Sequence, residues 1–285
     1  MAALSAKKIS RSTAGTVAII LFLSVLGIFM IIPFVYAILQ SLKPIEEIYI
    51  FPPRFWVVKP TLHNFSTLFK LSSSLWVPFG RYLLNSFGVA AICTTLQVIF
   101  ASMAAYPLSK YEFRGKNATF QLIVTALLFT GEVVFLPQYI LISWFRMLDS
   151  YWALILPSLA YPLGLYLMRQ NMIGFPDSVI EAARIDGAPE RIVFWKIVMP
   201  NMKPVWMTMI VFSFGAIWSR SDTSYIYSEQ LKGLPSLLTQ ISASGIARAG
   251  AGAAATVILM IPPILIFLLT QSKVIETMAN SGLKE

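Results

Sequence analysis

Charged residues are scarce in this chain. Of its 285 residues, only 12% are Asp, Glu, Lys or Arg and 57% are hydrophobic, and the mean hydropathy is +0.71. About a quarter of the residues in a soluble domain are charged. The chain therefore has too little polar surface to face water on every side. This composition excludes an ordinary soluble fold and predicts an all-α integral membrane protein.

Cysteine and histidine are almost absent. The single cysteine, Cys93, excludes an intrachain disulfide and a cysteine-based metal cluster. It lies in an apolar stretch, where we expect it to be a small buried side chain. The single histidine, His63, lies in a polar loop and cannot form a metal site alone. We expect no metal site.

A phosphate-binding loop of the form G-x-x-x-x-G-K-[S/T] is also missing. The nearest candidate is Gly115-Lys116-Asn117, which lacks both the upstream glycine and the hydroxyl residue. We therefore expect no nucleotide cofactor in this chain and no ATPase site of its own. If the protein drives an energy-requiring process, the energy must come from a partner or from an ion gradient.

Acidic residues are outnumbered, which gives a net charge of +9. The basic residues lie in short segments between apolar stretches, as membrane topology requires, and form no groove-lining patch. Nucleic acid is thus excluded as a partner. Lys7, Lys8 and Arg11 precede the first apolar stretch, which is too long for a signal-peptide core, so we expect that stretch to be retained.

Six apolar stretches predict six transmembrane helices in a single domain, 1–285. They cover residues 14–41, 82–107, 118–142, 151–172, 204–219 and 251–271. An even number places both termini on one side. With the termini inside, the 22 Lys and Arg residues divide into 13 inside and 9 outside, which favours an N-in, C-in topology. Gly and Ala residues at 247–255 predict close helix packing.

The segment 174–203, between the fourth and fifth predicted spans, is polar and amphipathic. Asp186-Gly187 is a turn signal, and Gly187 suits a position with positive φ. Pro189 restarts a helix that ends near Pro200. The pattern predicts two helices joined by a turn on the cytoplasmic face. Periodicity alone also fits an interfacial connector anchored by aromatic residues.

The residues of this segment carry a more specific signal. Glu181-Ala182-Ala183, Gly187 and Pro200 stand at the spacing of the signature loop of ABC importer permeases, which the sequence resembles. The wider string, with Ile185-Asp186-Gly187-Ala188, is similar to the carbohydrate-uptake branch and to its smaller maltose-type permease. Met199 departs from the usual leucine, a volume-conserving change.

This resemblance implies a fold, a set of partners and a location. In the family the loop docks on a cytoplasmic ATPase. On this chain, Glu181 is implied to pair with a basic residue of that ATPase, Ala182 and Ala183 to allow a close fit, and Gly187 to make the turn. The implied partners are a second homologous permease, an ATP-binding subunit dimer carrying ATP and Mg²⁺, an extracytoplasmic solute-binding protein and a carbohydrate substrate. The implied location is a bacterial-type cytoplasmic membrane, with several passes.

Glu132 lies inside an apolar stretch, where a carboxylate is costly and is often functional. One interpretation places it on the substrate path; another pairs it with Arg146 or with a neighbouring subunit. An alternative function, an ion-coupled secondary carrier, would use Glu132 as the coupling carboxylate. A membrane enzyme is disfavoured because no cluster of catalytic polar groups is visible, and a passive scaffold is a further alternative.

The end of the fifth predicted span combines aromatic and polar residues. Sugar sites use aromatic rings against C–H surfaces, and amides or carboxylates for hydroxyl groups. Trp218, Asp222, Tyr225 and Tyr227 are therefore candidate contacts for the substrate or for a docked binding protein. The other interpretation is an interfacial aromatic belt beside a solvated loop.

Overall fold

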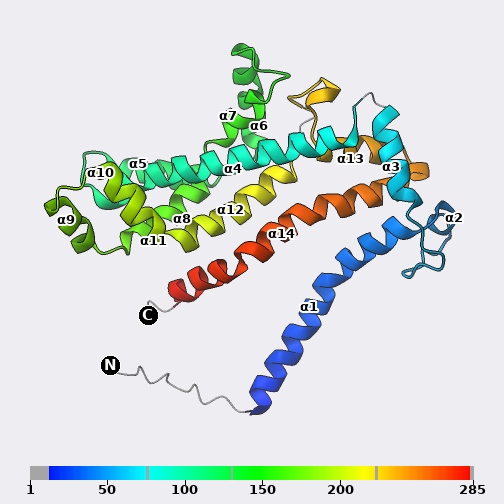
Figure 1. Ribbon diagram of the computed structural model, residues 1–285, viewed down its shortest axis with the longest axis horizontal. Coiled ribbons are helices and arrows are strands. Elements are labelled where there is room, and N and C mark those ends of the chain that lie inside the picture. Colours follow the sequence, from blue (N-terminus) through cyan, green and yellow to red (C-terminus); the bar gives the residue numbers. More distant parts are fainter. Residues whose placement is uncertain (1–12, 75–76, 130, 222–223, 283–285) are drawn as a thin grey trace.

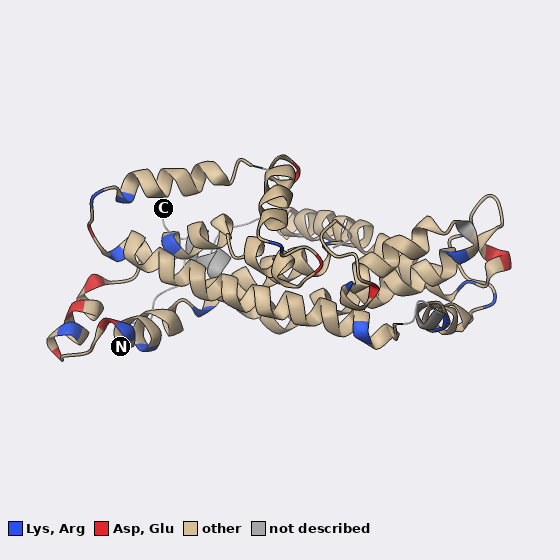
Figure 2. Cartoon of the chain, turned by 90° about the horizontal axis from the view of Figure 1, so that it is seen from above, with Lys and Arg blue, Asp and Glu red and all other residues tan. Residues whose placement is uncertain are grey.

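The structure is a computed structural model that describes residues 13–74, 77–129, 131–221 and 224–282. The described residues are helical or irregular and contain no strand, which confirms the predicted all-α class. The helices lie mostly along one long axis (Figure 1). Charged residues lie mostly near the two ends of this axis and in loops, and the long helices between the ends carry few of them (Figure 2). This distribution suits a protein whose middle lies in lipid.

Three helices are individually long and apolar enough to cross a membrane. They are α1 (Thr13–Leu42), α4 (Phe79–Lys110) and the part of α14 (Ala249–Gly282) that ends at Ser272. Two bent helix pairs raise the number of candidate spans to five. The six-span count and the N-in, C-in orientation remain predictions.

Two of the stretches predicted as single spans are broken. The 118–142 stretch forms α5 (Lys116–Ala126) and α6 (Gly131–Trp144), which meet at 105°. The 151–172 stretch forms α7 (Trp152–Ser158) and α8 (Pro162–Ile173). The second break has a local cause: Tyr161 precedes a proline, which disfavours a helical backbone at that residue, and its φ and ψ are −120° and 77°.

The predicted 174–203 segment is helical and lies at one end of the molecule (Figure 1). It contains α9 (Asp177–Ile185), α10 (Glu190–Ile192), the π-helical turn η1 (Val193–Val198) and α11 (Met199–Asn201). The next helix, α12 (Lys203–Trp218), is bent by 76° from residues 190–201. The other short elements are α2 (Ile45–Ile48), α3 (His63–Ser74), η2 (Glu229–Leu231), α13 (Leu234–Ala243) and η3 (Ile246–Arg248).

Helix α4 is the centre of the packing. It lies against α8 and α12, and α12 packs in turn on α14. One buried cluster joins α4, α8, the 174–203 segment and α12, and a second joins α3, α4, α12, α13 and α14. Cys93 on α4 is fully buried, as predicted. By contrast, the apolar window of α1 has none of its residues buried, so this helix is available to lipid or to another chain.

The Gly/Ala-rich start of α14 confirms the prediction of close helix packing. Ala251, Ala254 and Ala255 are almost fully buried. A Cβ atom on Gly250 would lie 2.3 Å from Oδ1 of Asn64, whose amide donates to the carbonyls of Ser41 and Lys43. Glycine is required here because the Asn64 side chain occupies the space, and this contact ties α3 and the end of α1 to α14.

Candidate functional site

The exposed end of the molecule is a helical hairpin, which we call the 177–201 hairpin. Its turn is at Gly187, where φ is +78°, and this confirms the predicted positive φ. The Gly187 amide donates to the Arg184 carbonyl and the Ala188 amide to the Ala183 carbonyl, both at 3.0 Å. These two bonds form a Schellman motif, which ends α9 and turns the chain sharply.

The two faces of α9 are clearly different. Ile180 and Ala183 are buried against α4, α8 and the rest of the hairpin, whereas Glu181 and Ala182 are exposed. The residues of the Glu-Ala-Ala motif therefore lie on different faces of α9. Ala183 packs inward, and Ala182 is the small residue on the outward face. Asp186 and Pro200 are exposed as well. A carboxylate beside a small residue on an exposed helix face is accessible to a partner protein.

An ionic network, which we call the brace, links the two arms of the hairpin, α9 before the turn and α10 after it. Nε of Arg184 lies 2.5 Å from Oε1 of Glu190, and a terminal guanidinium nitrogen of Arg184 donates to the Tyr111 hydroxyl at 3.1 Å. The Tyr106 hydroxyl donates to Oε2 of Glu190 at 3.0 Å. Because Tyr106 lies in the last turns of α4 and Tyr111 directly follows the helix, the network joins both arms of the hairpin to the C-terminal end of α4.

A second contact holds the start of α9 to the same end of α4. Nζ of Lys110 lies 2.7 Å from Oδ1 of Asp177 and also donates to the Phe175 carbonyl. The Lys110 side chain is 4% exposed, so water screens this ion pair less than a pair between two exposed side chains. Lys110 and the Arg184–Glu190 network together connect the hairpin to α4 at two points.

Glu190 is ionised at neutral pH, as its ion pair with Arg184 requires. Burial alone would raise the pKa of Glu190, but hydrogen bonds from Arg184, Tyr111 and Tyr106 outweigh burial and hold the pKa below its usual range. Because the folded pKa is depressed, the stabilisation is present above the unfolded pKa and is lost only as the pH falls through the folded pKa. The brace is therefore ionised throughout the neutral range.

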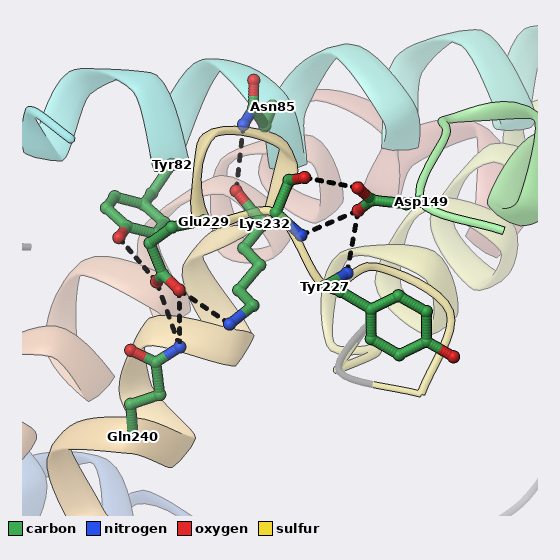
Figure 3. Close-up of polar contacts among 8 residues, drawn as sticks. Tyr82, Asn85, Asp149, Tyr227, Glu229, Lys232 and Gln240 are labelled. Carbon is green, nitrogen blue, oxygen red and sulfur yellow. Dashed lines mark hydrogen bonds and ion pairs between the residues drawn. The ribbon is translucent and has the colours of Figure 1, made fainter. Parts of the chain in front are cut away.

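At mid-length, a loop after α12 is held against the turn between α6 and α7. The Asp149 amide donates to the Tyr225 carbonyl at 2.8 Å, and Oδ1 of Asp149 accepts from the amides of Tyr227 and Ser228 at 2.9 and 2.7 Å. The Ser228 hydroxyl also donates to the Asp149 carboxylate (Figure 3). These contacts fix residues 225–228 on the α6–α7 turn.

The same loop is tied to α4 and α13 through Glu229. Its carboxylate accepts from the Tyr82 hydroxyl at 2.8 Å, from Nζ of Lys232 at 2.7 Å and from the Gln240 amide at 3.0 Å (Figure 3). Burial acts to raise the pKa of Glu229, but the bonds from Lys232, Tyr82 and Gln240 lower it further than burial raises it.

The same loop is also bonded to Asn85 of α4. The Asn85 amide donates to the carbonyls of Gln230 and Lys232, both at 2.9 Å. The loop is therefore fixed in position by several polar contacts.

The residues proposed for a substrate path do not form one group. Glu132 and Tyr225 line the same cavity of about 330 Å³, but Trp218 is not part of it. Trp218 is buried, stacks on Phe214 and donates to the Leu259 carbonyl at 2.8 Å. The Tyr227 hydroxyl shares a 2.8 Å hydrogen bond with that of Tyr139. Asp222 lies outside the described residues.

Glu132 makes no ion pair with Arg146 among the described residues. The structure also shows functional candidates that the sequence did not single out. Gln138 and Arg220 line the cavity together with Glu132. The Arg184–Glu190 pair was missed too, although two opposite charges flanking the Asp186-Gly187 turn were a usable signal. Tyr106 and Tyr111 gave no such signal, because they are distant in sequence.

Together, the long apolar helices and the exposed hairpin at one end are those of a helical membrane protein. Comparison with known proteins identifies the family. The model of the family described as "Binding-protein-dependent transport system inner membrane component" matches residues 97–277. The chain belongs to this family of membrane transport components. Membership excludes the ion-coupled secondary carrier as its function, so Glu132 is not the coupling carboxylate of such a carrier.

Individual relatives agree with this assignment. The chain is 33% identical to Protein LplC of Bacillus subtilis over 213 residues, which cover 73% of this chain and 68% of the relative. It is 28% identical to the arabinooligosaccharides transport system permease protein AraQ of Bacillus subtilis, over 94% of this chain and 95% of AraQ. A solved bacterial ABC transporter involved in the import of the acidic polysaccharide alginate has the same fold, with a TM-score of 0.76 and 21% identity over 92% of this chain and 98% of that chain.

Proposed function

We propose that this chain is one of two permease subunits of an ATP-driven importer for a carbohydrate, such as an oligosaccharide or a polysaccharide fragment. It forms the translocation path with a second, homologous permease and contains no ATPase site of its own. The other components are an ATPase dimer that binds ATP and Mg²⁺ and an extracytoplasmic solute-binding protein. The observation that carries the proposal is the exposed Glu181-Ala182 face on a hairpin braced to α4.

The hairpin supports a coupling role through its connections. Its outward face offers a carboxylate and a small residue to a groove on the ATPase, where a basic residue pairs with Glu181. Its inward face is joined to α4 through Glu190 and Lys110. When the ATPase dimer closes, the hairpin moves with it and displaces the end of α4. Alternating access follows because α4 packs on α8 and α12.

The carbohydrate class is supported by the relatives and by the loop after α12. AraQ, which aligns along nearly the whole chain, is named for arabinooligosaccharides. In this chain, the fixed loop carries Tyr225 and Tyr227 beside polar side chains. Aromatic rings and planar polar groups in one place suit sugar rings and their hydroxyl groups.

The membrane arrangement is part of the same proposal. Six spans with both termini in the cytoplasm place the 177–201 hairpin on the ATPase side and the 220–248 segment outside. The predicted spans remain 14–41, 82–107, 118–142, 151–172, 204–219 and 251–271. The third is bent between α5 and α6, and the fourth is interrupted between α7 and α8. The membrane is the cytoplasmic membrane of a bacterial-type cell, as the description of the family indicates.

Co-purification with transport tests the proposed function. Mild-detergent extraction of this chain is expected to bring down a second permease and an ATPase, and uptake into cells is expected to continue when the ion gradients are dissipated but ATP is kept. Purification of the chain alone, together with uptake that stops when the gradient collapses, would contradict the proposal.

A further inference from the structure

One cavity differs in character from the larger ones. Two cavities of about 610 Å³ each are lined mostly by apolar side chains of α12, α14 and their neighbours. The cavity of about 330 Å³ between α6 and the loop after α12 has a larger share of polar and charged lining residues. Its lining residues are Gly131, Glu132, Phe135, Gln138, Arg220 and Tyr225. Ligand pockets range from about 300 to 1,000 Å³, so its size suits a single sugar ring.

The lining carries opposite charges that do not neutralise each other directly. No ion pair joins Glu132 to Arg220, although both line the same cavity. Glu132 supplies only acceptors, Arg220 only donors, and the Gln138 amide supplies both. Vicinal hydroxyl groups can donate to the carboxylate and accept from the guanidinium at the same time. A polyhydroxylated ring between the two side chains would therefore satisfy both.

Aromatic residues complete the cavity. The Tyr225 ring lies 5.7 Å from the Phe135 ring, and the Arg220 guanidinium lies 5.5 Å from the Tyr225 ring centre. Tyr225 is 2% exposed, and its buried hydroxyl makes no well-formed hydrogen bond to a described residue, although the Arg220 side chain is close enough to interact with it. Buried polar atoms are normally bonded, so one without a well-formed bond calls for an explanation. A nearby ligand hydroxyl is one partner that would provide it.

The position of the cavity is fixed by the fold. Helices α6 and α7 project to one side of the bundle, about half-way along α4 (Figure 1). Asp149, in the turn between α6 and α7, holds Tyr225 and its neighbours in place. Glu132 and Phe135 are exposed, so the cavity opens away from the bundle.

We propose that Glu132, Gln138, Arg220 and Tyr225 form a subsite for a neutral sugar ring of the transported carbohydrate. This inference rests on the proposed function and narrows its substrate class. One carboxylate and one guanidinium give the lining no net charge, so a neutral ring binds without leaving a charge unpaired. A uronate ring brings a second carboxylate near Glu132, and like charges in a small cavity repel.

Equilibrium dialysis on the intact complex tests the subsite. The importer, with both permeases and the ATPase, is placed in nanodiscs without binding protein. The labelled probes are an arabinose trisaccharide, which is neutral, and an alginate trisaccharide, which is acidic. The neutral probe is expected to bind more tightly. Glu132→Gln and Arg220→Gln are each expected to weaken its binding about tenfold or more, because hydrogen bonds to charged groups are lost.

Two further variants distinguish the loss of a ligand contact from a loss of binding caused by misfolding. Tyr225→Phe removes one hydroxyl from the cavity and is expected to weaken the neutral probe several-fold. Tyr139→Phe removes a neighbouring hydroxyl that bonds to Tyr227 instead, and is expected to change binding less than twofold. Co-purification of the ATPase with each variant verifies assembly.

The outcomes separate the subsite from the proposed function. Wild-type affinity in Glu132→Gln, Arg220→Gln and Tyr225→Phe, tighter binding of the acidic probe, or no binding of either probe overturns the subsite. If ATP-driven sugar uptake by the intact importer continues in that case, the proposed function stands without it. Absence of any ATP-driven sugar uptake overturns both.

Discussion

At the scale of single residues, Gly187 shows most directly how the sequence determines the hairpin. Its φ of +78° lies in the left-handed region, and its amide closes the Schellman motif with Arg184. A side chain in this conformation costs roughly 1–2 kcal/mol because its Cβ approaches the following carbonyl. No other atom lies within 4 Å of a Cβ added at Gly187, so the cost is conformational and does not come from crowding.

Replacing Gly187 is therefore expected to loosen the hairpin without unfolding the membrane domain. Gly187→Ala should speed trypsin cleavage after Arg184 and Arg191 several-fold, and Gly187→Asn should lie between Ala and wild type because Asn tolerates the left-handed region. Limited proteolysis in detergent measures this. Gly80→Ala, at a helical position that is equally open, is the matched control. Equal cleavage rates for Gly187→Ala and wild type would show that the turn does not depend on glycine.

At the scale of elements, the brace between the hairpin and α4 determines whether the two move together. Arg184 and Glu190 lie on different arms of the hairpin, and Tyr106 and Tyr111 attach them to α4. The Arg184–Glu190 pair is about half exposed, so its contribution to overall stability is small. Its importance lies in geometry, because it fixes the angle between the arms.

We predict that Glu190→Gln raises the amount of ATP hydrolysed per sugar taken up at least twofold, while the complex still assembles. The physical reason is that a neutral amide loses the ion pair to Arg184, so less of the hairpin's movement reaches α4. Hydrolysis and uptake measured in the same proteoliposomes give the ratio. Glu112→Gln removes the ion pair between the exposed Glu112 and Lys116, just beyond α4, and serves as the control. An unchanged ratio in Glu190→Gln would mean that the brace does not transmit the movement.

The elements also show what the sequence could and could not predict. Hydropathy located the apolar stretches, because lipid requires long apolar helices, and Asp186-Gly187 located the turn through local backbone chemistry. The brace was not predictable, since Tyr106 and Tyr111 lie far along the chain from Glu190. The inward packing of Ala183 likewise depends on the orientation of α9 against α4, which periodicity leaves open. The cavity at Glu132 depends on a loop that folds back from a distant helix.

At the scale of the whole molecule, the account depends on which end faces the cytoplasm. The hairpin and the termini must lie on the ATPase side, and the segment between α1 and α4 must lie outside. The fold relationship to a solved ABC transporter covers 92% of the chain and fixes the architecture. The predicted excess of basic residues inside, 13 against 9, favours the proposed orientation.

Cysteine labelling tests this orientation. Cys93 is buried and is replaced by alanine to give a cysteine-free background. Lys59→Cys and Glu112→Cys then place one thiol at each of two exposed positions on opposite predicted sides. A membrane-impermeant maleimide is expected to label the first in intact spheroplasts and the second only after lysis. The reverse pattern would show an inverted topology.

The central claim, that the 177–201 hairpin couples this chain to an ATPase through Glu181, is tested most directly by charge reversal. Uptake and ATP hydrolysis are measured in proteoliposomes holding the complete importer with Glu181→Lys, and Glu112→Lys is the control on another exposed carboxylate. The account predicts that Glu181→Lys lowers both substrate-stimulated hydrolysis and uptake at least tenfold, because a basic partner is repelled, while Glu112→Lys remains near wild type. Normal substrate-stimulated hydrolysis and normal uptake with Glu181→Lys would contradict it.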